Sequence, residues 1–256
     1  MSPTAVAVQV PADQFVLVAY DWCVNLGAPA ALVAGAVIAT LYENVRGGAL
    51  SVYNSDPPYT VVAKKLTNIL LLSAFGFQIM SIFVTTVMGT MLVSRDFAPM
   101  VASQLKSKLP VATTALGFLR QHFEFEYLTA RISFLQGLLN WLGAVAIEYT
   151  IPRKNSGKAG REMDLFIASS LSLLLVLLLS FYNSHLTFYD NYLHMLCRWA
   201  KLFCKRFVTP RPLAILYAPL MLLSIITGIK AILPEKEGNL DDDYLGTLDR
   251  PPMLKK

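Results

Sequence analysis

Charged residues are scarce in this sequence. Asp, Glu, Lys and Arg make up 15% of its 256 residues, whereas soluble domains average about 25%. Hydrophobic residues make up 55%, and they gather in runs long enough to cross a bilayer. This composition is not that of a soluble domain. It predicts an all-α, multi-pass transmembrane bundle with little mass outside the bilayer.

Cysteine and histidine are also rare. The three cysteines, Cys23, Cys197 and Cys204, include no Cys-x-x-Cys pair, so neither a zinc site nor a disulfide framework follows. His185 and His194 are nine residues apart, which places them on opposite sides of the single helix expected there. We therefore predict reduced thiols, no metal site and no cofactor.

Catalytic motifs are missing as well. The sequence contains no Gly-rich phosphate loop, no nucleophile elbow and no His-Glu-x-x-His motif. We therefore predict that the protein is not an enzyme. A transporter has less support than the two hypotheses given below, because no inverted repeat and no paired broken helices are visible.

Positive charge prevails, with a net charge of +5, and the basic residues lie between the apolar runs. In a membrane protein such residues suit lipid head groups rather than nucleic acid. Counted over alternating loops, nine basic residues lie on the N-terminal side of the bilayer and seven on the other. The positive-inside rule then favours a cytoplasmic N-terminus.

Four apolar runs predict four membrane spans, which are Ala28–Val45, Leu66–Val93, Tyr127–Ile151 and Leu165–Tyr182. Asp164 is the expected N-cap of the fourth span. The stretch Asp56-Pro57-Pro58 between the first two spans is expected to be extended. The helix of the fourth span is expected to continue to Phe207, with a basic end formed by Arg198, Lys201, Lys205 and Arg206, which we predict to contact lipid head groups.

The sequence therefore divides into four parts. Residues 1–27 are expected to form an N-terminal interfacial segment, because the apolar run Phe15–Val24 is too short to span. Residues 28–209 form the four-helix bundle with its extended fourth helix. Residues 210–233 form an additional apolar helix that is long enough to cross, and residues 234–256 form an extended polar tail.

The first span ends on an acid, Glu43. Its 18 residues cover about 27 Å, close to the thickness of the hydrocarbon core. Helical steps back from Glu43 place Ala39, Ala36, Leu32 and Ala28 on the same face. A face of such small residues accommodates either a neighbouring helix or a narrow aqueous path. Glu43 itself either pairs with Arg46 in solvent or belongs to an ion path.

The order of these segments resembles the Orai family of store-operated calcium channels. Ala31–Glu43 is similar to that family's pore helix, in which a glycine precedes the selectivity glutamate by eight residues, as Gly35 precedes Glu43. Glu126–Tyr149 resembles the third helix, and Phe181–His185 resembles the end of the fourth. The resemblance covers residues 28–201. Where the family has bulky apolar and then basic pore residues, this chain has alanines and one leucine.

The resemblance implies a cyclic homo-oligomer that conducts cations. It assigns ion selectivity to Glu43, the pore lining to Ala28, Leu32, Ala36 and Ala39, and a hinge to Gly35. A second hypothesis stays open, in which the chain is a non-catalytic accessory subunit of a larger respiratory or photosynthetic membrane complex. Small-residue helix faces and the extended acidic tail favour contacts with other membrane subunits. The expected partners are therefore the lipid bilayer and either further copies of this chain or other subunits.

Overall fold

The computed structural model describes residues 12–53, 56–94, 114–152, 157–208 and 214–232. All regular elements in these ranges are helical. They are α1 (Ala12–Gly47), α2 (Pro58–Ser94), α4 (Ala115–Thr150), α5 (Lys158–Ser184), α6 (Tyr192–Phe203), the single π-helical turn η1 (Cys204–Val208) and α7 (Ala214–Ile232). The predicted all-α fold is confirmed.

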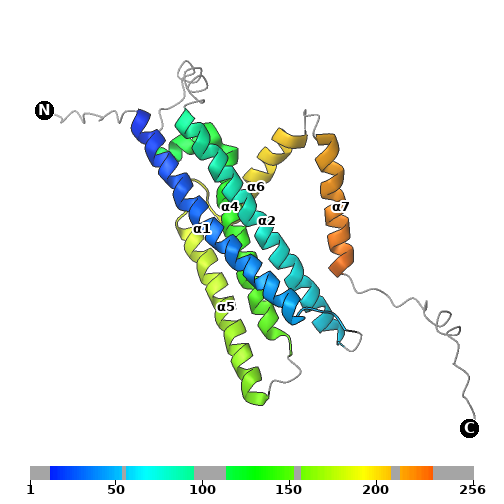
Figure 1. The fold of residues 1–256 in the computed structure, drawn as a ribbon. Helices are drawn as coiled ribbons and strands as arrows, with labels where there is room; N and C mark the ends of the chain where they lie inside the picture. Colours follow the sequence, from blue (N-terminus) through cyan, green and yellow to red (C-terminus); the bar gives the residue numbers. More distant parts are fainter. Residues whose placement is uncertain (1–11, 54–55, 95–113, 153–156, 209–213, 233–256) are drawn as a thin grey trace, which may run out of the picture.

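The long helices form a bundle in which α2 and α4 are central (Figure 1). α2 packs against both α1 and α4, and α4 also packs against α5 and α6. α7 stands apart from the bundle and touches mainly α2 and η1. The predicted C-terminal apolar helix is thus present as α7, over residues 214–232.

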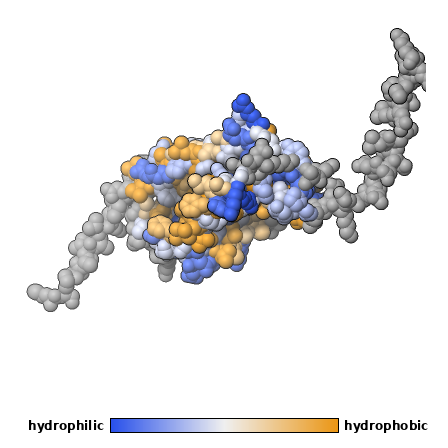
Figure 2. Space-filling model, turned by 90° about the horizontal axis from the view of Figure 1, so that it is seen from below, coloured by the Kyte–Doolittle hydropathy of each residue, from blue (hydrophilic) through white to orange (hydrophobic). Residues whose placement is uncertain are grey.

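Four helices are long and apolar enough to cross a membrane. These candidate spans cover Val16–Gly47, Pro58–Ser94, Ala115–Thr150 and Lys158–Ser184. Large apolar side chains lie exposed along them, as water-facing helices of a soluble protein would not allow. The chain is therefore an integral membrane protein with four candidate spans. At the end of the bundle seen in Figure 2, hydrophilic groups lie beside the apolar surface, as expected where helices leave the bilayer.

The predicted boundary between an interfacial segment and the first span is wrong. α1 runs without a break from Ala12 to Gly47, with Pro29 inside it. The N-terminal half of α1 is held by packing, because Ala19 and Cys23 are buried in the main hydrophobic cluster of the chain. Burial of this face outweighs the cost of one proline in the helix.

Two predicted helix starts are also wrong. α2 begins at Pro58, where a proline's missing N–H is not needed, and the backbone N–H of Thr60 donates to the carbonyl of Pro57 at 2.9 Å. α5 begins after Gly157, so Asp164 is not an N-cap but a buried residue within the helix.

The fourth helix does not continue to Phe207. α5 ends at Ser184, and the chain turns before α6, whose N-cap is Asn191. The Asn191 side chain accepts from the N–H of His194 at 2.7 Å, and the Asn183 side chain accepts from the N–H of Tyr192 at 2.9 Å. Asparagine competes with the helix backbone in this way and favours a new helix start. The turn returns an amphipathic helix to the surface of α4.

Polar side chains join α2 to α4 inside the bundle. Gln78 donates to the carbonyl of Phe134 at 3.1 Å, and Ser81 donates to the carbonyl of Ala130 at 3.1 Å. Gly137 allows the two helices to approach this closely, since a Cβ atom there would lie 2.6 Å from Nε2 of Gln78. In a membrane bundle, small residues and hydrogen bonds replace the hydrophobic effect as the force between helices.

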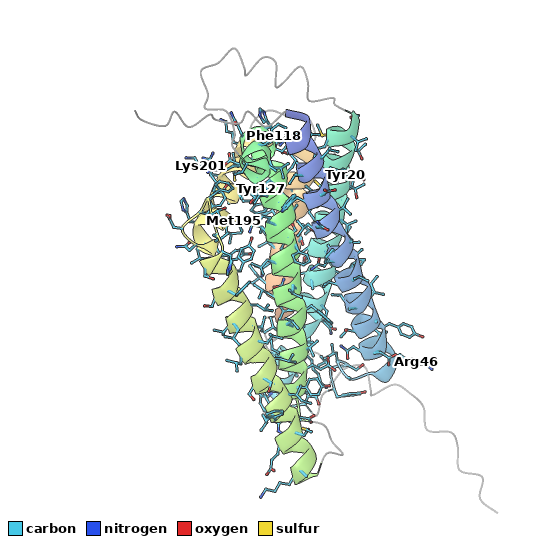
Figure 3. The ribbon with its side chains drawn as sticks, turned by 90° about the vertical axis from the view of Figure 1, so that its left-hand side faces the viewer. Tyr20, Arg46, Phe118, Tyr127, Met195 and Lys201 are labelled. Atoms are coloured by element: carbon cyan, nitrogen blue, oxygen red, sulfur yellow. The ribbon has the colours of Figure 1, made fainter. Side chains whose placement is uncertain are left out.

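Aromatic residues fill the core toward the N-terminal end of α4. Tyr127 is fully buried, and its ring lies 5.1 Å from that of Trp22 on α1. Met195 of α6 is fully buried in the same cluster (Figure 3). This cluster therefore holds α1, α4 and α6 together. It extends past the C-terminal end of α5.

Candidate functional site

α1 has one buried face and one uncovered face. Ala30, Ala34 and Val37 are buried against the bundle. The predicted pore-lining residues lie on the other side, where Ala28, Leu32 and Ala39 are exposed and Ala36 is half-buried. Leu32 is 77% exposed. The structure thus brings the predicted lining residues together on one uncovered strip of α1.

Two hydrogen bonds between α1 and α4 set the rotation of α1 about its own axis. The indole N–H of Trp141 donates to the hydroxyl of Thr40 at 3.2 Å. One turn further, the amide of Asn44 donates to the carboxylate of Glu148 at 3.1 Å, and Asn44 is buried. Because Asn44 points inward, its neighbour Glu43 points outward, and the Glu43 carboxylate is exposed.

Of the two alternatives for Glu43, the pairing with Arg46 is not seen. Both side chains are exposed at the end of α1, and among the described residues no ion pair joins them. Figure 3 shows Arg46 pointing away from the bundle. Glu43 therefore stands at the helix end on the uncovered face with its charge available to solvent or to a neighbouring molecule.

Gly35, the predicted hinge, lies within an unbroken stretch of α1. It is exposed, and a Cβ atom at this position would meet nothing within 4 Å. Packing within the chain therefore does not require a glycine here. A close approach by another helix at this face, or a bend in another conformation, would require one.

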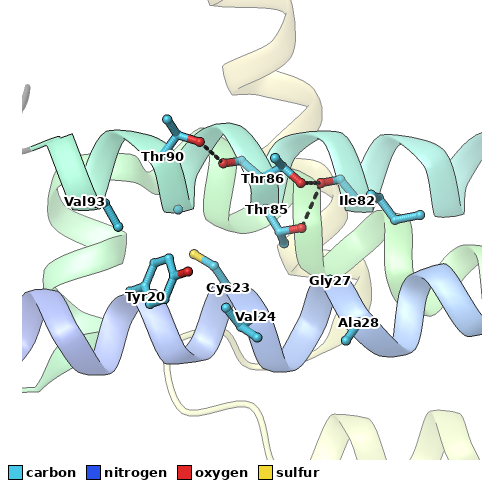
Figure 4. A pocket seen from close by; sticks show the side chains of 11 residues that line it. Tyr20, Cys23, Val24, Gly27, Ala28, Ile82, Thr85, Thr86, Thr90 and Val93 are labelled. Carbon is cyan, nitrogen blue, oxygen red and sulfur yellow. Dashed lines mark hydrogen bonds between the residues drawn. The ribbon is translucent and has the colours of Figure 1, made fainter.

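A groove between α1 and α2 adjoins the uncovered strip and was not foreseen from the sequence (Figure 4). Its volume is about 430 Å³, and its walls include Tyr20, Cys23 and Ala28 of α1. The hydroxyls of Thr85 and Thr86 on the opposite wall donate to carbonyls of their own helix. Since these hydroxyls are already hydrogen-bonded within α2, the groove offers a mainly apolar surface. The small residues on both helices were the sequence signal for it.

The residues predicted to contact head groups fall into two sets. Arg198 donates to both oxygens of Glu124, at 2.9 and 2.8 Å, and Arg206 forms an ion pair with Glu126. The hydrogen bonds that Arg198 donates to the Glu124 carboxylate raise the pKa of Arg198 above its ordinary value. These two arginines therefore dock α6 and η1 onto α4. Lys201 and Lys205 are exposed.

Tyr192 anchors the start of α6 in the bundle. Its hydroxyl donates to Oε1 of Gln136 at 2.9 Å, and burial raises the pKa of Tyr192 to about 12. Between its ordinary pKa of about 10 and that value, a detached α6 loses the phenolic proton while the docked helix keeps it. We therefore expect docking of α6 to weaken as pH rises through this interval.

Hydrogen exchange of the α6 amides, followed across alkaline pH, measures this effect. The variant Tyr192→Phe lacks the ionisable group and should show a shallower rise in exchange. An identical pH profile in the two proteins would contradict the assignment to Tyr192.

The histidines do not form a site together. His185 caps α5 and stacks on Phe181, with ring centroids 4.2 Å apart, while His194 lies on α6 with its Nδ1 3.3 Å from Asp190. Within the described ranges, no group of three or more His, Cys, Asp or Glu side chains could hold a metal ion. The two histidines lie on separate helices and not on the single helix that was expected.

No family model, no curated protein and no solved structure matches this chain.

Proposed function

We propose that the protein is a subunit of an Orai-like cation channel in which α1 lines the ion path and Glu43 attracts the cation. The observation that carries the proposal is the uncovered strip of α1. It runs along a membrane span, consists largely of small residues and ends at an exposed carboxylate.

The strip differs from a surface built for lipid. The exposed residues of α5 include many large aliphatic or aromatic side chains, among them Leu173, Val176 and Phe181. On α1, Ala28, Gly35 and Ala39 occupy comparable exposed positions. Small residues make little contact with acyl chains, but they permit close approach of another helix or leave space for water.

A single copy presents the strip on its outer surface, so the proposed path forms between several copies arranged around an axis. Closed cyclic symmetry would bring one Glu43 from each copy into a ring, and rings of carboxylates select cations. The hydrogen bonds at Thr40 and Asn44 would then hold each α1 with the same face toward the axis.

The test is cation flux into vesicles that contain the purified full-length chain. We expect Glu43→Gln to reduce uptake of Ca²⁺ and Ba²⁺ to the level of empty vesicles, because the ring loses its charge while the side-chain shape is kept. Glu162→Gln is the matched control, since Glu162 is also exposed and lies near the start of α5 at the same end of the bundle. Its flux should equal that of the wild type.

Unchanged flux in Glu43→Gln, with both variants assembled to the same native mass, would contradict the pore assignment. Absence of flux in the wild type would do so as well.

An accessory subunit of a larger membrane complex is the second candidate, and α7 favours it. From Pro219 to Lys230 the side chains of α7 are mostly apolar and exposed around the helix, including Leu222, Ile225 and Ile229. Such a helix needs lipid or partner helices on every side. Recovery of a stable complex with different polypeptides in gentle detergent would support this role, whereas a pure homo-oligomer would support the channel.

A further inference from the structure

We propose that Cys197 and Cys204 form a site of S-acylation by long-chain fatty acyl groups. Cys197 lies in α6, and Cys204 opens η1, so the two residues are about two helical turns apart. Both are exposed. Their spacing places both thiols on the same side of the helix.

This side of α6 is an apolar flank next to the buried face. Tyr192, Met195 and Trp199 point toward α4, where Tyr192 and Met195 are buried. At about 100° per residue, the neighbouring flank consists of exposed residues with little polarity, namely Leu193, Cys197, Ala200 and Cys204. Leu193 is 69% exposed, so the flank is not covered by the chain itself.

The flank lies next to the bilayer. α5, the span with the fewest buried residues, ends at Ser184, and α6 begins at Tyr192. The aromatic residues Tyr182, Tyr192 and Trp199 gather at this level, as aromatic belts do at the membrane–water interface. α7, a second apolar helix, follows η1. The thiols therefore belong to a juxtamembrane amphipathic helix, the setting in which cysteines are acylated.

The basic residues complete the surface. Lys201 and Lys205 are exposed beside the apolar flank, where they suit anionic head groups. The distribution of basic residues favours a cytoplasmic location for this side of the bilayer, where acyl-CoA thioesters are available.

The reaction is a thioester exchange. The Sγ thiolate of the cysteine attacks the carbonyl carbon of a long-chain acyl-CoA, so that a new S–C bond forms and the bond to the CoA sulfur breaks. CoA leaves as the thiolate and takes up the proton that the cysteine released, and no oxidant or reductant is needed. Each attached chain then inserts into the adjacent leaflet and holds α6 at the membrane.

The third cysteine provides an internal control. Cys23 is 2% exposed and lies in the main hydrophobic cluster between α1 and the rest of the bundle. Cys23 borders the groove between α1 and α2, but so little of its surface is exposed that acyl donors do not reach the thiol in the folded chain. Acylation is therefore expected at two of the three cysteines.

The experiment uses the full-length chain expressed in eukaryotic cells that are fed an alkyne-tagged palmitate. Free thiols are first capped with N-ethylmaleimide. Acylated cysteines are then released with hydroxylamine and labelled with a polyethylene-glycol maleimide, so that each acylated cysteine adds one mass increment. We expect two increments for the wild type and for Cys23→Ser, one for Cys197→Ser and for Cys204→Ser, and none for the double variant.

Three results would overturn the proposal. These are a wild type without hydroxylamine-dependent increments or alkyne label, a double variant that keeps them, and increments that appear with a reducing agent alone. The last would show that the two thiols form disulfides instead. Since both side chains are exposed, the serine variants should fold, and an unchanged native mass would verify this.

Discussion

Replacing Gly137 with alanine is expected to force α2 and α4 apart and to lower the free energy of unfolding by about 1–3 kcal/mol. The added Cβ would lie 2.6 Å from Nε2 of Gln78, 3.0 Å from Cδ of the same residue and 3.1 Å from the backbone oxygen of Ala74. Gln78 is fully buried and hydrogen-bonded, so it has little room to move, and the backbone of Ala74 has less. Gly137→Val should have a larger effect.

The matched control is Gly76→Ala on α2. A Cβ atom at Gly76 meets nothing within 4 Å, so this variant should change stability by less than about 1 kcal/mol, the difference in helix propensity between glycine and alanine. Unfolding by sodium dodecyl sulfate, followed by circular dichroism, compares the wild type with Gly137→Ala and Gly76→Ala. Equal stability of Gly137→Ala and Gly76→Ala would show that α2 and α4 are not held in the described contact.

Replacing Lys64 with methionine is expected to destabilise the chain by about 3–5 kcal/mol, because it leaves the Asp56 carboxylate in a buried site without the lysine's charge. Nζ of Lys64 lies 2.6 Å from Oδ2 of Asp56, and the two side chains are only 7% and 8% exposed. The same Nζ donates to the carbonyl of Ser51 at 2.7 Å and lies 5.1 Å from the ring centroid of Tyr53. One lysine thus fixes the connection between α1 and α2.

The neighbouring Lys65 separates this effect from a general loss of positive charge. Lys65 is half-buried and enters none of these contacts, so Lys65→Met should change stability by less than about 1 kcal/mol. The double variant Lys64→Met with Asp56→Asn should recover part of the loss, since neither partner is then charged. A double variant that is less stable than Lys64→Met would contradict the ion-pair explanation.

Neither of these contacts involves the uncovered strip of α1. Gly137, Gln78, Lys64 and Asp56 act between helices of one chain or in the connecting loop, whereas Glu43 and Leu32 are exposed. Folding of the single chain and use of its outer α1 face therefore depend on different residues. Variants at Glu43 should consequently alter flux without altering the stability of the bundle.

The positions of the spans followed from long apolar runs, but helix ends did not. Pro58 was expected in extended chain, although proline is well suited to the first turn of a helix, where α2 starts. The first span was expected to begin at Ala28, although the residues before it bury Ala19 and Cys23 and continue the same helix. In α1, burial of Ala19 and Cys23 decided between two conformations that the local sequence allows.

For the candidate site too, the sequence predicted one part, and only the folded chain decided the other. Helical periodicity placed Ala28, Leu32 and Ala39 on one face with Glu43, and the structure shows that this face is uncovered. The sequence could not show that the guanidinium of Arg198 docks on Glu124, because the partners are 74 residues apart and only the return of α6 onto α4 brings them together. A predicted head-group contact is therefore an intrachain ion pair.

Composition and hydrophobic run length were sufficient to establish a helical membrane protein with four spans, because an apolar helix of sufficient length has few stable places other than a bilayer. Which way each helix faces was decided only in the folded chain. Rotation depends on contacts between distant segments, such as Trp141 with Thr40 and Glu148 with Asn44. Those bonds turn Asn44 inward and Glu43 outward, and no local pattern in either helix encodes the pairing.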